Sequence, residues 1–185
     1  MRMKSRITTF TKIDFDALNP SMEDIRIADI AHALSMLTRA NGHFPKFFSV
    51  GQHSIQCCRE ALARNYSPRV AMACLLHDAS EAYISDITRP VKKYMTMYLQ
   101  IEDQLQSMIF EKFLGSSLEE EEAVLVDNID DGCLFYEFDH FMNIRMSEVE
   151  PVMVSNLNYD FRPMEDVEKE FLDLYREIAE ELKQN

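Results

Sequence analysis

Apolar side chains recur at intervals of three and four residues along most of the chain, which is the spacing of one face of an α-helix. The clearest stripe lies near the C-terminus, at Val167, Phe171, Leu174, Ile178 and Leu182. Such a stripe predicts a helix that packs against a core or against a second subunit. The pattern therefore favours a protein built mainly from helices.

Capping residues and helix breakers divide the rest of this pattern into segments. Proline is tolerated in the first turn of a helix, where Pro68 and Pro163 are expected, and glycine commonly follows a helix, as Gly115 is expected to do. We predict helices over residues 21–41, 49–65, 68–83, 91–114 and 117–141, and a last helix that begins at Pro163.

Two segments lack the helical period. Residues 6–18 alternate loosely between apolar and polar side chains, which predicts a short hairpin or an extended arm. Residues 143–162 predict a long connection, with a short strand at 152–154. Only 4 Gly and 6 Pro interrupt the 185 residues. The sequence thus predicts one all-α domain over residues 1–185, a helical bundle with a small N-terminal β element.

Charge and composition narrow the function. The formal net charge of −13 argues against binding to nucleic acid, because no basic stripe offsets the repulsion. No apolar run approaches the length that spans a bilayer, so we expect no membrane partner. The four cysteines have no C-x-x-C spacing and no secretory signal precedes them, which is typical of thiols in a reducing cytoplasm. We expect a cytoplasmic protein that acts on a small molecule.

The strongest chemical signal is a histidine followed directly by an aspartate. His77 and Asp78 come after the apolar run of residues 70–76. Burying an imidazole and a carboxylate together is costly unless something compensates both, and a divalent cation would do so. Glu81 is predicted to share a helical face with the pair. The alternative is an ordinary buried hydrogen-bonded pair at a helix end.

Further candidate ligands lie far away in the sequence. His53 is in the first turn of the helix predicted over residues 49–65. Asp127 and Asp130 are three residues apart in the helix predicted over residues 117–141, so both can face the same way. One of them is enough for a fourth ligand, and the spacing alone leaves both open.

A lone histidine, a His-Asp pair and a distant aspartate, in this order, resemble the HD-domain metal-dependent phosphohydrolases. The run His77-Asp78-Ala79-Ser80-Glu81, followed by Asp86 and by Pro90-Val91-Lys92, looks like the branch that contains the bacterial 5′-deoxynucleotidases. The resemblance implies an HD-domain helical bundle. It also takes in residues 29–35, Arg39 and Gly42-His43, within a span of roughly 7 to 141.

The resemblance also separates the two aspartates left open above. Similar proteins carry a glutamate seven residues after the ligand, and Glu137 stands seven residues after Asp130 rather than Asp127. The pair Asp131-Gly132 departs from the usual pattern of the family. The ligands implied for one divalent metal are His53, His77, Asp78 and Asp130.

Other residues are implied to act on the substrate. Arg39 matches an arginine that holds the substrate phosphate, and Glu81 and Asp86 match carboxylates that position water and handle protons. Lys92 could add a point charge to the phosphate. For His43, substrate contact and loop packing are equally good explanations. The aromatic residue that follows this arginine in characterised deoxynucleotidases is absent, so the sugar preference is not predicted.

Elementary electrostatics agrees with this ligand set. Two aspartates cancel the charge of a divalent ion, and coordination can lower the pKa of water from 15.7 to about 7. Histidine and aspartate together suit Mn, Co, Fe, Zn or Mg, and residue type alone does not choose among these metals.

We therefore expect a hydrolase that cleaves a phosphomonoester, in the first place a (deoxy)nucleoside 5′-monophosphate, by attack of metal-bound water. A homodimer is expected from the resemblance alone. One alternative is hydrolysis of a guanosine pyrophosphate or a cyclic dinucleotide. Another is a non-catalytic helical sensor or scaffold, although the intact ligand set with Glu81 and Asp86 argues against it.

Overall fold

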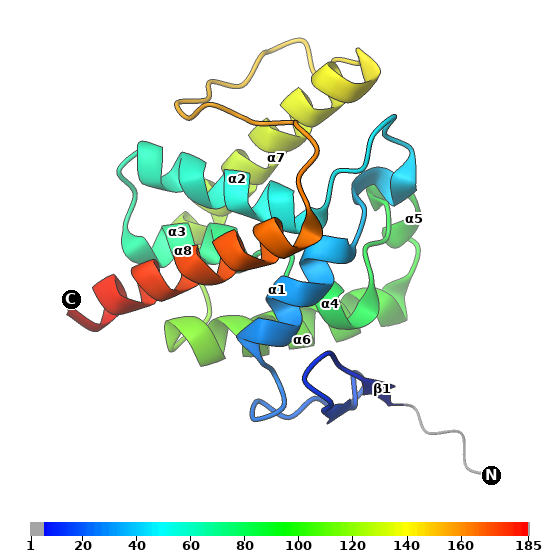
Figure 1. Cartoon of the computed structure of the whole chain (residues 1–185), viewed down its shortest axis with the longest axis vertical. Coiled ribbons are helices and arrows are strands. Elements are labelled where there is room, and N and C mark those ends of the chain that lie inside the picture. Colours follow the sequence, from blue (N-terminus) through cyan, green and yellow to red (C-terminus); the bar gives the residue numbers. More distant parts are fainter. Residues whose placement is uncertain (1–5, 185) are drawn as a thin grey trace.

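The computed structural model describes residues 6–184, and it is an all-α protein with one small β hairpin near its N-terminus (Figure 1). The predicted fold class is therefore confirmed. None of the helices within residues 6–184 is long and apolar enough to cross a membrane.

The hairpin pairs β1 (Ile7–Thr8) with β2 (Asp14–Phe15) in antiparallel register. Asp29 holds it against the helices, because its carboxylate accepts hydrogen bonds of 2.6 and 2.8 Å from the backbone N–H and the hydroxyl of Thr11. Phe15 is fully buried. Of the two predicted forms, a hairpin and an extended arm, the hairpin is the correct one.

Four helices surround the main hydrophobic core: α1 (Ile27–Met36), α2 (Val50–Ala63), α3 (Pro68–Leu76) and α8 (Met164–Gln184). Helix α2 is the central element, because it contacts the other three and nearly all of its residues are buried. The predicted C-terminal stripe lies on α8, which crosses α1 and α3 (Figure 1). Its buried members are Val167, Phe171 and Ile178.

Two further helices, α6 (Thr96–Leu114) and α7 (Glu120–Met142), pack against this core. Helix α6 ends as predicted at Gly115, whose φ of 84° is a left-handed conformation that glycine adopts readily. Helix α7 contacts α2 and α3. It therefore brings a third element to the region where α2 and the turn after α3 carry predicted ligands.

Several predicted helix starts are wrong. Ser21 and Asp24 form an isolated turn, because the Asp24 N–H donates to the Ser21 carbonyl, and α1 begins only at Ile27. Helix α7 begins at a capping box made by Glu119 and Glu122, and not at the predicted Ser117. The start at Ser49 is confirmed by its predicted capping box with Gln52.

Two predicted helices are interrupted. The segment predicted as one helix over 68–83 is divided into α3 and α4 (Glu81–Ile84). The segment over 91–114 is divided into α5 (Arg89–Lys92) and α6, because Met95 leaves helical geometry with φ −104° and ψ 68°. Both interruptions border the candidate site described below.

The connection between α7 and α8 has no strand where one was predicted. Instead, the fully buried carboxylate of Glu60 on α2 accepts hydrogen bonds of 2.7–3.1 Å from the backbone N–H groups of Val154 and Ser155. In a β-strand, backbone N–H groups such as these would donate to a neighbouring strand. Gly132 on α7 allows close packing, since a Cβ there would lie 2.9 Å from the Sδ of Met153.

Candidate metal centre

The α-helical hydrogen-bond pattern ends directly after Leu76, between α3 and α4, although His77 itself keeps helical φ and ψ angles of −61° and −33°. Gln106 of α6 occupies the break: its amide donates to the Leu76 carbonyl at 2.8 Å and accepts from the Ser80 N–H at 3.1 Å. In an uninterrupted helix these two backbone groups would bond to each other. His77 and Asp78 therefore lie in a tight turn, not on the continuous helix that the sequence predicted.

Two histidines present the same ring nitrogen to the interior. His77 Nδ1 donates to the Cys74 carbonyl at 2.8 Å, and Nδ1 of the fully buried His53 lies 2.6 Å from Oε1 of Glu137. Each Nδ1 proton thus has an acceptor, and each Nε2 keeps its lone pair when the ring is neutral. The two Nε2 atoms are 3.2 Å apart.

Two aspartate oxygens complete the cluster. Asp130 Oδ1 on α7 lies 3.0 Å from His53 Nε2 and 3.7 Å from His77 Nε2. Asp78 Oδ2 lies 3.2 Å from His77 Nε2 and 3.9 Å from His53 Nε2. All four atoms are acceptors when the rings are neutral, so they come this close only if protons or a cation lie among them. The structure therefore brings together the four residues that the resemblance implied as ligands.

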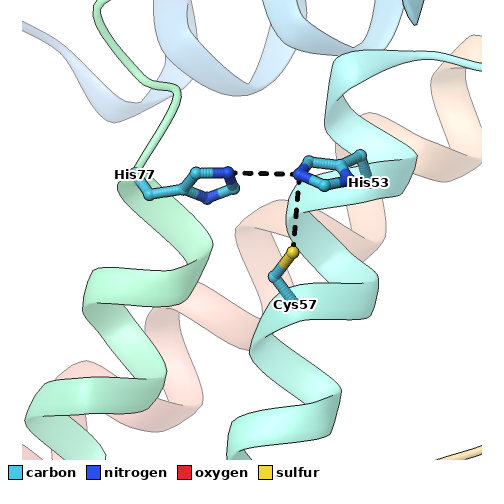
Figure 2. Close-up of side chains that lie close together, drawn as sticks. All are labelled: His53, Cys57 and His77. Carbon is cyan, nitrogen blue, oxygen red and sulfur yellow. Dashed lines mark hydrogen bonds between the residues drawn. The ribbon is translucent and has the colours of Figure 1, made fainter. Parts of the chain in front are cut away.

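A buried thiol lies beside the histidines. Figure 2 shows Cys57 one turn from His53 on α2, and its Sγ lies 3.5 Å from His53 Nε2. The ligand atoms of His53, Cys57 and His77 all lie within 4.8 Å of one another, so this group could hold a metal ion. Burial, reinforced by Cys133, raises the pKa of the Cys57 thiol well above its usual range. The thiol thus resists ionisation unless a metal displaces its proton.

Burial and charge oppose each other in this cluster. Burial lowers the pKa of His53 and so does Arg39, but Glu137 and Asp130 more than offset both and raise it to about 9. Burial lowers the pKa of His77 too, but Asp78 and Asp130 raise it well above its usual range. The carboxylates around the two rings therefore favour positive charge at this position, and one divalent cation would supply it.

Glu137 links the cluster to an arginine. Its fully buried carboxylate contacts His53 through one oxygen and accepts from Arg39 Nε at 3.3 Å through the other. Arg39 Nη1 also donates to Asp78 Oδ2 at 3.4 Å. The guanidinium is consequently fixed beside two of the four clustered residues. The glutamate seven residues after Asp130, noted in the sequence, is the residue that makes this link.

Arg39 begins a strained turn, η1 (Arg39–Gly42). Its backbone N–H donates to the Phe48 carbonyl at 2.9 Å, which anchors the start of the turn. Ala40 and Asn41 then adopt left-handed φ angles of 51° and 50°. For alanine this conformation costs about 1–2 kcal/mol, and strain of this kind concentrates at functional sites.

A cavity of about 410 Å³ opens beside the cluster, which is within the range of small-molecule sites. Arg39, Asp78 and Asp130 lie at its polar end, with Glu81 and Asp86. Its apolar lining includes Phe44, Ile87, Leu134, Phe138 and Met146.

Glu81 and Asp86 place two further carboxyl groups in the cavity wall. Glu81 is 4% exposed, and within residues 6–184 its Oε2 is buried without a hydrogen-bond partner. Burial raises the pKa of Glu81 well above its usual range, and the nearby charges of Asp78 and Asp86 raise it further. Burial also raises the pKa of Asp86. The pair can therefore hold a proton facing the ligand space.

Not every predicted residue reaches this cavity. His43 is exposed and is not among the residues that line it. Asp127 is exposed and lines a second cavity, of about 320 Å³, rather than joining the two histidines. Lys92 lines both cavities, but its Nζ donates to Glu102 Oε1 at 2.6 Å.

Sequence reasoning missed Arg89, which precedes Pro90 on α5. Its Nη2 donates to Asp130 Oδ2 at 2.6 Å, its Nη1 donates to Asp131 Oδ1 at 2.7 Å, and its side chain lines the cavity. A basic residue directly before the Pro90-Val91-Lys92 run was the available signal. Asp131, which departs from the family pattern, is thus one of the two anchors of this arginine.

Comparisons with known proteins complete this description. No family model matches the chain. The uncharacterized protein YfdR of Escherichia coli K12 is 36% identical over 109 residues, which are 59% of this chain and 58% of that protein. An uncharacterized protein of Rhodobacter capsulatus is 36% identical over 104 residues, 53% of this chain and 53% of that protein. The matches thus span little more than half the length of these relatives.

Proposed function

We propose that this protein is an HD-type metal-dependent phosphohydrolase whose divalent cation is held by His53, His77, Asp78 and Asp130. The observation that carries the proposal is the convergence of two imidazole Nε2 atoms and two carboxylate oxygens from α2, α7 and the turn after α3. The order and type of these residues support the same conclusion, because they resemble the metal-binding set of that family.

The spacing of the donors fits one ion. Donor atoms bound at about 2.1 Å are about 3.4 Å apart around a tetrahedral ion and about 3.0 Å apart around an octahedral one. The donor pairs measured above are 3.0 to 3.9 Å apart. Asp130 offers its second oxygen, Oδ2, to Arg89, and Arg39 contacts the clustered oxygen Oδ2 of Asp78, so both carboxylates have supporting contacts typical of metal centres.

The four nitrogen and oxygen donors are preferred to the group that includes Cys57. Asp130 Oδ1 is nearer to His53 Nε2 than the Cys57 Sγ is, at 3.0 Å against 3.5 Å. The carboxylate is also ionised already, whereas the thiol must first lose a proton. Cys57→Ala should therefore leave Mn²⁺ affinity unchanged, and Asp130→Ala should abolish it.

The bound ion would activate water and polarise a phosphoryl oxygen. The chain's own groups supply the remaining steps. Arg39 binds and orients the phosphate, since its guanidinium is fixed and lines the cavity. Glu81 and Asp86 hold the proton that moves to the leaving oxygen.

A nucleoside 5′-monophosphate is the proposed substrate. The cavity joins a charged end to a wall containing Phe44 and Phe138, and a nucleotide joins a charged phosphate to a planar base in the same order. Aromatic side chains stack on any base, so this wall supports nucleotides as a class without choosing a base.

The test is metal analysis of the purified full chain, followed by phosphate release from a panel of nucleoside 5′-monophosphates, guanosine pyrophosphates and cyclic dinucleotides. We expect one divalent ion per chain and release from monophosphates. Asp78→Ala should lose both properties, whereas Asp127→Ala, an exposed aspartate near the cluster, should keep both. Hydrolysis by Asp78→Ala at the parent rate would refute the proposal.

A further inference from the structure

We infer that Arg89 is a second substrate-binding cation, which holds the phosphate oxygens that face the mouth of the cavity; this inference rests on the proposed function. Arg89 lies on α5, lines the 410 Å³ cavity and is 59% exposed in its side chain. It is therefore accessible from the ligand space.

The charge of the cavity favours such a group. Its polar wall contains the carboxyl groups of Asp78, Glu81, Asp86 and Asp130. A phosphate monoester carries up to two negative charges at neutral pH and gains stability only where cations outweigh these acids. The bound metal and Arg39 would largely balance the wall, so a further cation would add the attraction that a phosphate needs.

Arg89 is better placed for this role than Lys92. The Lys92 ammonium donates to Glu102 Oε1 at 2.6 Å, and its side chain is 21% exposed. The Arg39 side chain is only 11% exposed, and it already contacts both Glu137 and Asp78. Among the described cations of the cavity wall, Arg89 thus offers the most open surface to an incoming anion.

The guanidinium of Arg89 is also fixed before any ligand binds. Asp130 and Asp131 together take two of its five N–H donors, through different terminal nitrogens. Asp130 offers its other oxygen to His53, so a single carboxylate separates Arg89 from the proposed metal position. A guanidinium is planar and can bind phosphate through two N–H groups at once. Because the Arg89 side chain is already held by two carboxylates, it loses little conformational freedom when phosphate binds.

The test is the affinity of the Mn²⁺-loaded full chain for inorganic phosphate, measured by isothermal titration calorimetry at saturating Mn²⁺. Arg89→Gln should weaken phosphate binding roughly tenfold to a hundredfold, the usual range for hydrogen bonds to a charged group. Arg89→Lys should fall between Arg89→Gln and the parent, since it keeps the charge without the fork. Lys93→Gln is the matched control, because it removes one charge just after α5 from a side chain that does not line the cavity.

Metal content and thermal stability of each variant establish that the comparison is between folded, loaded proteins. In turnover of a phosphomonoester, Arg89→Gln should raise KM more than it lowers kcat. Equal phosphate affinity in Arg89→Gln and the parent would overturn the inference and leave the proposed function standing. If Lys93→Gln weakened phosphate binding equally, the inference would also be overturned, because the effect would then come from net charge alone. A parent that binds no metal would overturn the proposed function and this inference together.

Discussion

Glu137 supports the candidate centre, although it is not one of the proposed ligands. It contacts His53 at 2.6 Å and Arg39 at 3.3 Å from a fully buried position on α7. It thereby sets the tautomer of one proposed ligand and the position of the proposed phosphate-binding arginine. Partners of this kind commonly change metal affinity as much as some ligands do.

We predict that Glu137→Gln lowers Mn²⁺ affinity about 10- to 100-fold, because the neutral amide no longer favours the Nδ1 proton of His53. Competition with a chelating dye measures the effect. Asp139→Asn, two residues along the same helix, alters a surface ion pair with Arg145 and should leave the affinity unchanged. Wild-type affinity in Glu137→Gln would show that His53 is held by packing alone.

The sequence predicted residues better than it predicted their contacts. The resemblance implied His53, His77, Asp78 and Asp130 together as ligands, and the structure places their side chains in one cluster. His43 has the same chemistry but stands exposed, and composition does not show where a loop side chain points. Arg89 was missed for the opposite reason. Its importance comes from a contact with Asp130 across 41 residues, which no local pattern encodes.

At the scale of elements, the interruption between α3 and α4 is what separates His77 and Asp78 from an ordinary helix. Gln106 of α6 takes the Leu76 carbonyl and the Ser80 N–H that would otherwise pair. A continuous helix over 68–83 was predicted because the local sequence has strong helical spacing and no breaker. The cause of the break lies on another helix, beyond the reach of local rules.

We predict that Gln106→Ala weakens metal binding by roughly tenfold or more, because the turn that carries two of the proposed ligands loses the amide that holds it open. Metal titration followed by calorimetry is the measurement. Gln104→Ala, at an exposed position on the same helix, is the matched control and should behave as the parent. If Gln106→Ala binds metal normally, the turn is maintained by the ligands themselves.

Glu60 should make the connection between α7 and α8 sensitive to acid. Burial alone would raise its pKa, but hydrogen bonds from Ser155, Val154 and Arg64 more than offset this and hold the pKa below its usual value of 4.5. The stabilisation is therefore present above about pH 4.5 and is lost as the pH falls through the lowered pKa.

Urea unfolding of the parent and of Glu60→Gln tests this. At pH 7 the variant should be less stable by about 1–3 kcal/mol, since charge-assisted hydrogen bonds are lost. The difference should shrink steadily below pH 4.5. Glu148→Gln, at an exposed position in the same connection, is the control. A difference that does not change with pH would mean that the carboxylate charge contributes nothing.

At the scale of the whole molecule, the candidate centre connects several elements of the fold. The proposed ligands come from α2, the turn after α3, and α7, so one ion would connect parts of the chain that are far apart in sequence. The all-α class followed from the helical period because that signal repeats along the entire chain. The placement of the helices relative to one another could not be predicted from this period, because it depends on packing between residues far apart in the sequence.

We predict that Mn²⁺ at a hundred times its dissociation constant raises the free energy of unfolding by about 2.7 kcal/mol, because the ion binds only the folded chain. Denaturant titrations with and without the metal measure the difference. Asp78→Ala should show no such increase. An equal increase in Asp78→Ala would place the stabilising ion elsewhere, for example among the acidic groups on the surface.

Met146 reaches the cavity from the exposed segment 142–150, whereas the four metal-binding candidates come from tightly packed helices and the turn between them. The segment is fastened further along, where Glu60 holds Val154 and Ser155. Substitutions over 144–150 would therefore reshape the outer rim of the cavity without touching the four metal-binding candidates. Loop grafting and combinatorial libraries over this segment are consequently a way to vary what the proposed site accepts while its proposed ligands stay the same.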